Sequence, residues 1–98
     1  YTRVPIQTEV TCTVGSRSVR ATSWNLSQGG MQVEGDGLNP KDAVRLSFKL
    51  PVSGVTIDAA GVVVWAKENR QGIQFTSVGT ESQQSIRRFM AEVENIER

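Results

Sequence analysis

The sequence predicts a mainly β domain in which six antiparallel strands form a barrel or a sandwich, followed by one C-terminal α-helix. Residues 4–78 contain six segments of largely alternating apolar and polar side chains, separated by short connections rich in glycine, proline or asparagine. No helical pattern lies between these segments, so a parallel sheet with crossover helices is not expected. Apolar side chains at helical spacing occur only in residues 80–96. Residues 1–98 are therefore expected to form a single domain.

The first two strands are predicted by alternation. Residues 4–14 (VPIQTEVTCTV) have the period of a half-buried strand, with inward side chains at Val4, Ile6, Val10, Cys12 and Val14. Gly15 and Ser16 indicate a turn, and residues 18–26 (SVRATSWNL) predict the second strand. The apolar phase of this strand slips between Ala21 and Trp24, which indicates a β-bulge.

The middle of the chain predicts one short strand and one regular strand. Residues 31–34 (MQVE) form the short strand, and residues 35–42 (GDGLNPKD) form a loop dense in breakers. Residues 44–50 (VRLSFKL) alternate without interruption, and residues 51–54 then turn the chain.

The last two strands are expected to form a hairpin. Residues 55–66 (VTIDAAGVVVWA) predict a long strand, in which Gly61 marks a bulge or a close approach of another backbone. Asn69 and Arg70 indicate the hairpin turn, and residues 72–78 (GIQFTSV) return along the neighbouring strand.

The C-terminal helix is predicted from its start signal and its apolar stripe. Thr80 and Gln83 match a capping box. Arg87 and Arg88 fall mostly on the solvent face of the helix. The stripe, which has to dock on the barrel or on a partner, comprises Ile86, Phe89, Met90, Val93 and Ile96.

The composition excludes several classes of function. The chain has no histidine and one cysteine, so a Ser-His or Cys-His nucleophile and a zinc cluster are not expected. Asp58, the only carboxylate inside an apolar run, is expected to face solvent, so we predict neither an enzyme nor a metal or cofactor. A net charge of +1 argues against DNA or RNA as a partner, and no segment approaches a membrane span. The lone Cys12, expected to be inert in the core, is typical of a cytoplasmic protein.

The segment NLSQGG, residues 25–30, combines groups that can hold a ligand. Asn25 and Ser27 are two residues apart, so on an extended backbone they project from one face with amide and hydroxyl groups. Gly29 and Gly30 allow a ligand to lie against the backbone. Taken alone, these six residues favour a polar β-turn capped by Asn25 over a binding site.

The order of strands and this segment together resemble the PilZ domain, a bacterial receptor module for cyclic di-GMP. Asn25, Ser27 and Gly30 match the family motif [D/N]xSxxG, and Gly29 adds the doubled glycine of many members. Residues 62–75 (VVVWAKENRQGIQF) look like the later hairpin of the family, and a C-terminal helix follows. The resemblance implies a six-stranded antiparallel split barrel that binds cyclic di-GMP through Asn25, Ser27, Gly29 and Gly30.

The second family motif, RxxxR, is half present. Arg3 stands where its second arginine is expected, and the first would lie two residues before Tyr1. This implies that Arg3 binds ligand and that the chain is part of a longer protein. Arg20, Trp65 and Arg70 are auxiliary candidates for ligand contact. For Arg20 and Arg70 the pattern favours solvated charges, and for Trp65, as for Trp24, it favours packing in the core.

The resemblance implies a cyclic di-GMP sensor that converts binding into a conformational change in a larger cytoplasmic protein. Its partners would be cyclic di-GMP and either other domains of the same polypeptide or a separate protein. One alternative is a degenerate PilZ-like domain that serves only protein contacts. Another is a small nucleic-acid-binding barrel, which the near-neutral charge disfavours.

Overall fold

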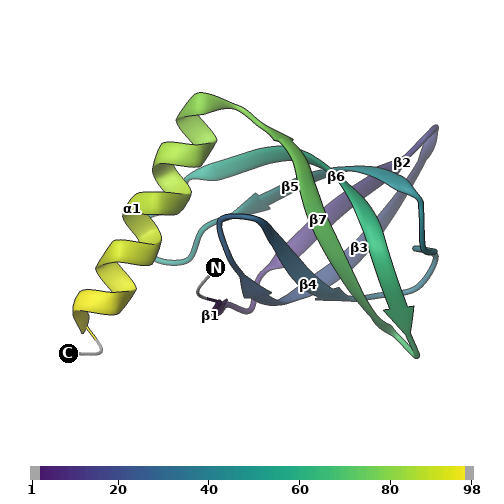
Figure 1. Cartoon of the computed structure of the whole chain (residues 1–98), viewed down its shortest axis with the longest axis horizontal. Helices are drawn as coiled ribbons and strands as arrows, with labels where there is room; N and C mark the ends of the chain where they lie inside the picture. Colours follow the sequence, from purple (N-terminus) through teal and green to yellow (C-terminus); the bar gives the residue numbers. More distant parts are fainter. Residues whose placement is uncertain (1–2, 97–98) are drawn as a thin grey trace.

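The computed structural model describes residues 3–96, which form a closed barrel with a helix at one end (Figure 1). The elements are β1 (Val4–Pro5), β2 (Glu9–Val14), β3 (Arg17–Leu26), β4 (Gly30–Glu34), β5 (Ala43–Lys49), β6 (Thr56–Lys67), β7 (Arg70–Val78) and α1 (Thr80–Ile96). The strands pair in the order β3-β2-β5-β6-β7-β4, and β4 also pairs with β3. All pairings are antiparallel, so the predicted six-stranded barrel is confirmed.

The predicted strand over residues 4–14 is wrong in one respect, because it is divided into β1 and β2. Both parts pair with β3, but residues 6–8 stand opposite only Ser23 and Trp24. The Ser23 hydroxyl fills this irregularity, since it accepts the Thr8 N–H at 2.9 Å and donates to the Ile6 carbonyl at 3.0 Å. Ser23 is therefore a buried polar residue whose hydroxyl both donates and accepts a hydrogen bond.

Bulges shift the face that each strand presents. On β3, Ser23 pairs with Val33 and Asn25 with Gln32, so Trp24 is the extra residue of the predicted bulge. Gly61 marks the expected close approach, because a Cβ built on it would lie 2.6 Å from the Gln74 carbonyl oxygen.

A further bulge, on β6, corrects the core position expected for Trp65. Val63 pairs with Ile73 and Trp65 with Gly72, which leaves Val64 unpaired on β6 and turns Trp65 outward. Its exposed fraction is 38%, and that of Trp24 is 44%, so neither tryptophan is a core residue. An alternation count carried through an extra residue assigns the wrong face to the side chain beyond it.

The barrel interior is filled by aliphatic side chains, and the lone cysteine is among them. Val10, Leu26, Ile57 and Val63 have almost no exposed surface. Cys12 is fully buried, and burial raises the pKa of its thiol to about 11. The thiol therefore stays protonated at neutral pH, as expected for an inert core residue.

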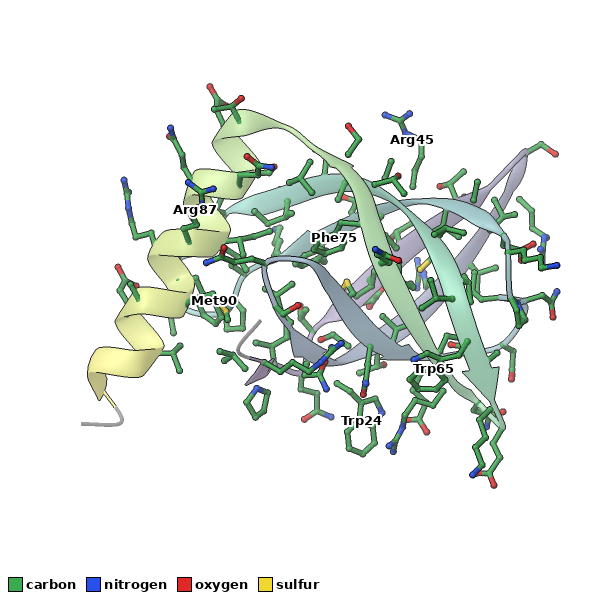
Figure 2. The ribbon with its side chains drawn as sticks, viewed as in Figure 1. Trp24, Arg45, Trp65, Phe75, Arg87 and Met90 are labelled. Carbon is green, nitrogen blue, oxygen red and sulfur yellow. The ribbon has the colours of Figure 1, made fainter. Side chains whose placement is uncertain are left out.

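Helix α1 covers one end of the barrel, and its inner face is apolar. Ile86, Phe89 and Met90 are buried, and Figure 2 shows Met90 between the helix and the barrel. The helix spans Thr80–Ile96, as predicted. The Gly79 carbonyl accepts the Gln83 N–H at 2.9 Å, so Gly79, and not Thr80, is the residue that precedes the first helical residue. The side chain of Ile96 lies outside the described residues. Within residues 3–96, no helix is long and apolar enough for a membrane crossing.

Candidate ligand-binding site

Three polar side chains form a hydrogen-bonded row on the outer face of the barrel. Arg3, just before β1, donates from Nη1 to Asn25 Oδ1 on β3 at 2.9 Å. Asn25 donates from Nδ2 to Gln32 Oε1 on β4 at 3.1 Å. Asn25 and Gln32 are half-buried and Arg3 is exposed. The row therefore links three neighbouring segments and presents a guanidinium at one end.

The row continues across the sheet to an aromatic ring. Gln32 stands opposite Gly72 on β7, and Gly72 stands opposite Trp65 on β6. A Cβ built on Gly72 would overlap the Trp65 indole, so the ring lies over the glycine. Glycine at position 72 leaves the space that the indole fills beside Gln32.

A second cluster, formed by Trp24, Glu34 and Arg70, borders this row. Trp24 donates from Nε1 to Glu34 Oε2 at 3.3 Å, and the Arg70 guanidinium carbon lies 3.8 Å from the Trp24 ring centroid. This spacing is that of a cation–π stack. Figure 2 shows Trp24 and Trp65 on the same side of the barrel, opposite Arg45.

Two open hollows adjoin the second cluster. One of about 360 Å³ lies beside Trp24 at the break between β1 and β2, and the other of about 390 Å³ lies between Trp65 and Arg70. Glu34 borders both hollows. This face thus combines hydrogen-bond donors, flat aromatic surfaces and room for a planar ligand with acceptor groups.

Ser27 does not face this surface, which corrects the expectation that it projects beside Asn25. The side chain is 3% exposed, and its hydroxyl donates to the Gly30 carbonyl at 3.2 Å and accepts the Gly29 N–H at 3.2 Å. The Ser27 N–H also donates to the Gly30 carbonyl, at 2.8 Å. In this structure Ser27 closes the loop that joins β3 to β4.

The two glycines of the loop serve the closure of the barrel. A Cβ built on Gly30 would overlap the Ile73 carbonyl oxygen, and the Gly29 carbonyl accepts the Phe75 N–H at 2.9 Å. Gly30 is buried. Its missing side chain is therefore required by the approach of β7, whereas the sequence had suggested room for a ligand.

Among the auxiliary candidates, Arg20 lies away from the row. It is exposed, it pairs with Glu9 at 3.4 Å, and it stands five residues before Asn25 on β3. At about 3.3 Å per residue, this is a separation of about 16 Å along the strand. Arg70 and Trp65, in contrast, both border the hollow of about 390 Å³ described above.

Gln32, Trp24 and Glu34 were not predicted as site residues. Gln32 could have been found, because a polar side chain at the centre of MQVE is expected to face outward next to the motif. Trp24 and Glu34 depend on the bulge, and its effect on their direction does not follow from alternation. Among the side chains that the structure describes, residues 3–93, no group of three or more His, Cys, Asp or Glu is placed to hold a metal ion.

Because their surroundings differ, we expect substitutions of Asn25 and Ser27 to have different effects on the stability of the domain. Ser27→Ala should lower the free energy of unfolding by about 1–3 kcal/mol, because it leaves the Gly29 N–H without its partner and removes one of the two hydrogen bonds to the Gly30 carbonyl. Asn25→Ala should change it by less than about 1 kcal/mol, since its contacts lie near the surface. Urea denaturation of both variants tests this, and equal losses would contradict the distinction.

Comparison with protein families and solved structures shows what this chain is similar to. The family model described as PilZ domain matches residues 1–92. No curated protein matches the chain. Among solved structures, the chain is similar to the Bacillus subtilis inhibitor of motility MotI/DgrA, with a TM-score of 0.83 and 22% identity over 100% of this chain and 52% of that one. The chain therefore spans about half the length of that relative.

Two further structures contain the same fold. The PilZ domain of YcgR from Escherichia coli, with c-di-GMP, has a TM-score of 0.75 and 15% identity, over 100% of this chain and 92% of that chain. The PlzA protein of Borreliella burgdorferi, in complex with c-di-GMP, has a TM-score of 0.72 and 16% identity, over 91% of this chain and 39% of that chain. The family match over most of the sequence and the shared barrel show that this chain belongs to the PilZ domain family.

Proposed function

We propose that this domain is a receptor for cyclic di-GMP and binds it on the face that carries Arg3, Asn25 and Gln32. The observation that carries the proposal is the Arg3 guanidinium, which Asn25 holds at 2.9 Å on the outer face of the barrel. A guanidinium can donate two parallel hydrogen bonds to phosphate oxygens or to the O6 and N7 atoms of guanine. Cyclic di-GMP carries both kinds of acceptor.

Each part of the site has a role in this proposal. Arg3 supplies charge-assisted hydrogen bonds, and Asn25 fixes its position. The Trp24 and Trp65 rings offer flat surfaces to guanine, and Arg70 adds a cation next to Trp24. Ser27 and the two glycines at 29–30 hold the loop in shape. The domain would bind its ligand and carry out no chemistry.

Two structural neighbours support the choice of ligand. The PilZ domain of YcgR and the PlzA protein are both described with c-di-GMP. At 15% and 16% identity their likeness establishes the fold, so the ligand is carried to this chain as a proposal. The chemistry of the Arg3–Asn25 pair is the independent support from this chain.

Binding is proposed to change the shape of a larger bacterial cytoplasmic protein by two routes. Arg3 lies at the entrance to the domain, so its capture by ligand would move the segment before it. The loop that joins β3 to β4 also lies near α1, because Gln28 lines a pocket of about 100 Å³ together with Gln83, Ile86 and Arg87. A loop that shifts on binding would therefore press on the helix.

A second candidate function is a protein-contact module that binds no nucleotide. The observation that favours it is the exposure of large side chains on β3 and β6, with exposed fractions of 44% for Trp24, 50% for Val64 and 38% for Trp65, and the two tryptophans lie on the same side of the barrel (Figure 2). Neighbouring exposed apolar groups are typical of interaction surfaces. Nucleotide titration separates the two candidates.

The test is calorimetric titration with cyclic di-GMP, with GMP and cyclic di-AMP as comparison ligands. We expect binding of cyclic di-GMP that Arg3→Ala weakens about tenfold to a hundredfold, the range for one charge-assisted hydrogen bond. Added salt should weaken cyclic di-GMP binding by the unmodified protein more than binding by Arg3→Ala, because the contact that the variant lacks joins opposite charges.

Arg20→Ala is the matched control for this measurement. It removes an exposed arginine of the same barrel that is paired with Glu9 rather than with the row. Its affinity for cyclic di-GMP should stay within about twofold of that of the unmodified protein, a smaller change than the loss of even a weak neutral hydrogen bond would cause. Equal losses in the Arg3 and Arg20 variants would indicate attraction by general charge. Absence of binding would favour the protein-contact module.

A further inference from the structure

The atoms that meet along the polar row leave only one arrangement of its two amides. A guanidinium has donors and no acceptor, so the Asn25 atom that faces Arg3 has to be the oxygen. The other end of the Asn25 amide is then an NH₂ group. The Gln32 atom that it faces, at 3.1 Å, has to be the carbonyl oxygen.

The second amide is thereby left with its donors directed onward. Gln32 Nε2 has no hydrogen-bond partner within residues 3–96, and the Gln32 side chain is half-buried. Its neighbour across the sheet is Gly72, over which the Trp65 indole lies. The row therefore begins with guanidinium donors and ends with amide donors beside an aromatic ring.

We propose that Gln32, together with Arg3, fixes the direction of this row and, through it, the choice of ligand. The inference rests on the proposed function. Gln32 accepts the Asn25 NH₂ group, which supports the orientation with the Asn25 oxygen toward Arg3, and it offers its own NH₂ group to the ligand. Such a site accepts an edge that carries acceptors, such as guanine O6 and N7 or a phosphate. It disfavours an adenine edge, because the adenine amino group would face a second donor.

An asparagine needs this partner, whereas an aspartate does not. Without an acceptor at position 32, only the exposed Arg3 side chain opposes a rotation of the Asn25 amide by 180°, which would present NH₂ to Arg3. An aspartate in place of Asn25 would present oxygen in either orientation. Asn25→Asp therefore supplies a background in which the positioning role of Gln32 is no longer required.

The first test is a double-mutant cycle on cyclic di-GMP affinity. Gln32→Met, which keeps the length of the side chain, should weaken binding about tenfold, the equivalent of one neutral hydrogen bond. In the Asn25→Asp background Gln32 has to donate its NH₂ group to the new carboxylate and no longer to the ligand. The same change should therefore weaken binding less than about threefold there, the lower end of that range. Equal losses in both backgrounds would overturn the positioning role.

The second test asks whether Gln32 determines the choice of ligand through its own NH₂ group, apart from its contact with Asn25. Gln32→Glu keeps an acceptor for Asn25 but replaces the outward donors with a carboxylate oxygen. It should therefore retain the Arg3–Asn25 contact and lose about tenfold or more of its preference for cyclic di-GMP over cyclic di-AMP, the value of one hydrogen bond. An unchanged preference would overturn the role of Gln32 in specificity.

A measurement without ligand distinguishes failure of this inference from failure of the proposed function. In ¹⁵N NMR spectra of the free protein, the Arg3 Nε–H signal should broaden or shift toward the free value in Gln32→Met and keep its position in Gln32→Glu. An unchanged signal in Gln32→Met refutes the inference even if the nucleotide binds. If the Arg3 signal changes as expected but no form of the protein binds nucleotide, the role of Gln32 in the row is supported and the proposed receptor function is refuted. Unaltered melting temperatures show that both variants remain folded.

Discussion

Gly30→Ala is expected to destabilise the domain by roughly 4 kcal/mol, which is a large part of the total stability of a small domain. The single methyl group would overlap the Ile73 carbonyl oxygen, and this oxygen belongs to the backbone of a paired strand. Relief requires β4 and β7 to separate at Gly30–Gln74, next to the hydrogen bond from Phe75 N–H to the Gly29 carbonyl. The barrel would lose the pairing that closes it.

Gly79→Ala is the matched control, because the same methyl group at that position meets no atom within 4 Å. It should change the free energy of unfolding by less than about 1 kcal/mol. Urea denaturation followed by circular dichroism measures both variants. If Gly30→Ala is as stable as Gly79→Ala, the close approach of β7 is not what excludes a side chain there. Any loss of nucleotide binding would then be a direct effect on the ligand.

Phe89→Ala has the second largest expected effect, a loss of about 3–5 kcal/mol in the free energy of unfolding, the usual result of deleting a buried ring. Phe89 is 9% exposed and packs in the core cluster with Ile86 and Met90, where α1 meets the end of the barrel. The cavity would remain, because the neighbouring strands are fixed by their pairing.

Arg88→Ala, one residue earlier on the exposed face of α1, is the control and should change stability by less than about 0.5 kcal/mol. Sedimentation velocity of the same variants gives a second readout. A Phe89→Ala protein that keeps its stability but loses self-association would show that the apolar stripe serves an interface. That result would favour the protein-contact module.

Much of the fold follows from the sequence because alternation and turn residues are local signals. Residues 44–50 alternate without a break, and β5 lies there as predicted. The helical stripe likewise identified Ile86, Phe89 and Met90 as buried. Family resemblance implied that the strands close into a barrel, but not that β4 closes it against β3 and β7, since no local pattern specifies which strands meet across a barrel.

The site was harder to predict because it depends on register. Asn25 could be assigned from its motif, and the structure places it between Arg3 and Gln32. Ser27 belongs to the same motif, yet the turn of the loop directs its hydroxyl inward. Trp65 was misassigned because one extra residue reverses the face of everything after it. Such reversals are set by pairing with a partner strand, which the sequence of one strand does not contain.

The pairing of Gly30 with Gln74 also has a consequence for how the domain acquires activity over time. Strand partners so distant in sequence meet slowly, because the loop between them must first lose its freedom. The row at Asn25 and Gln32 ends at Gly72 and Trp65, so no early fragment of the chain contains it whole. A nascent or partly folded chain would therefore not bind the proposed ligand. Ligand binding would appear in a single step, at the rate at which the entire barrel folds.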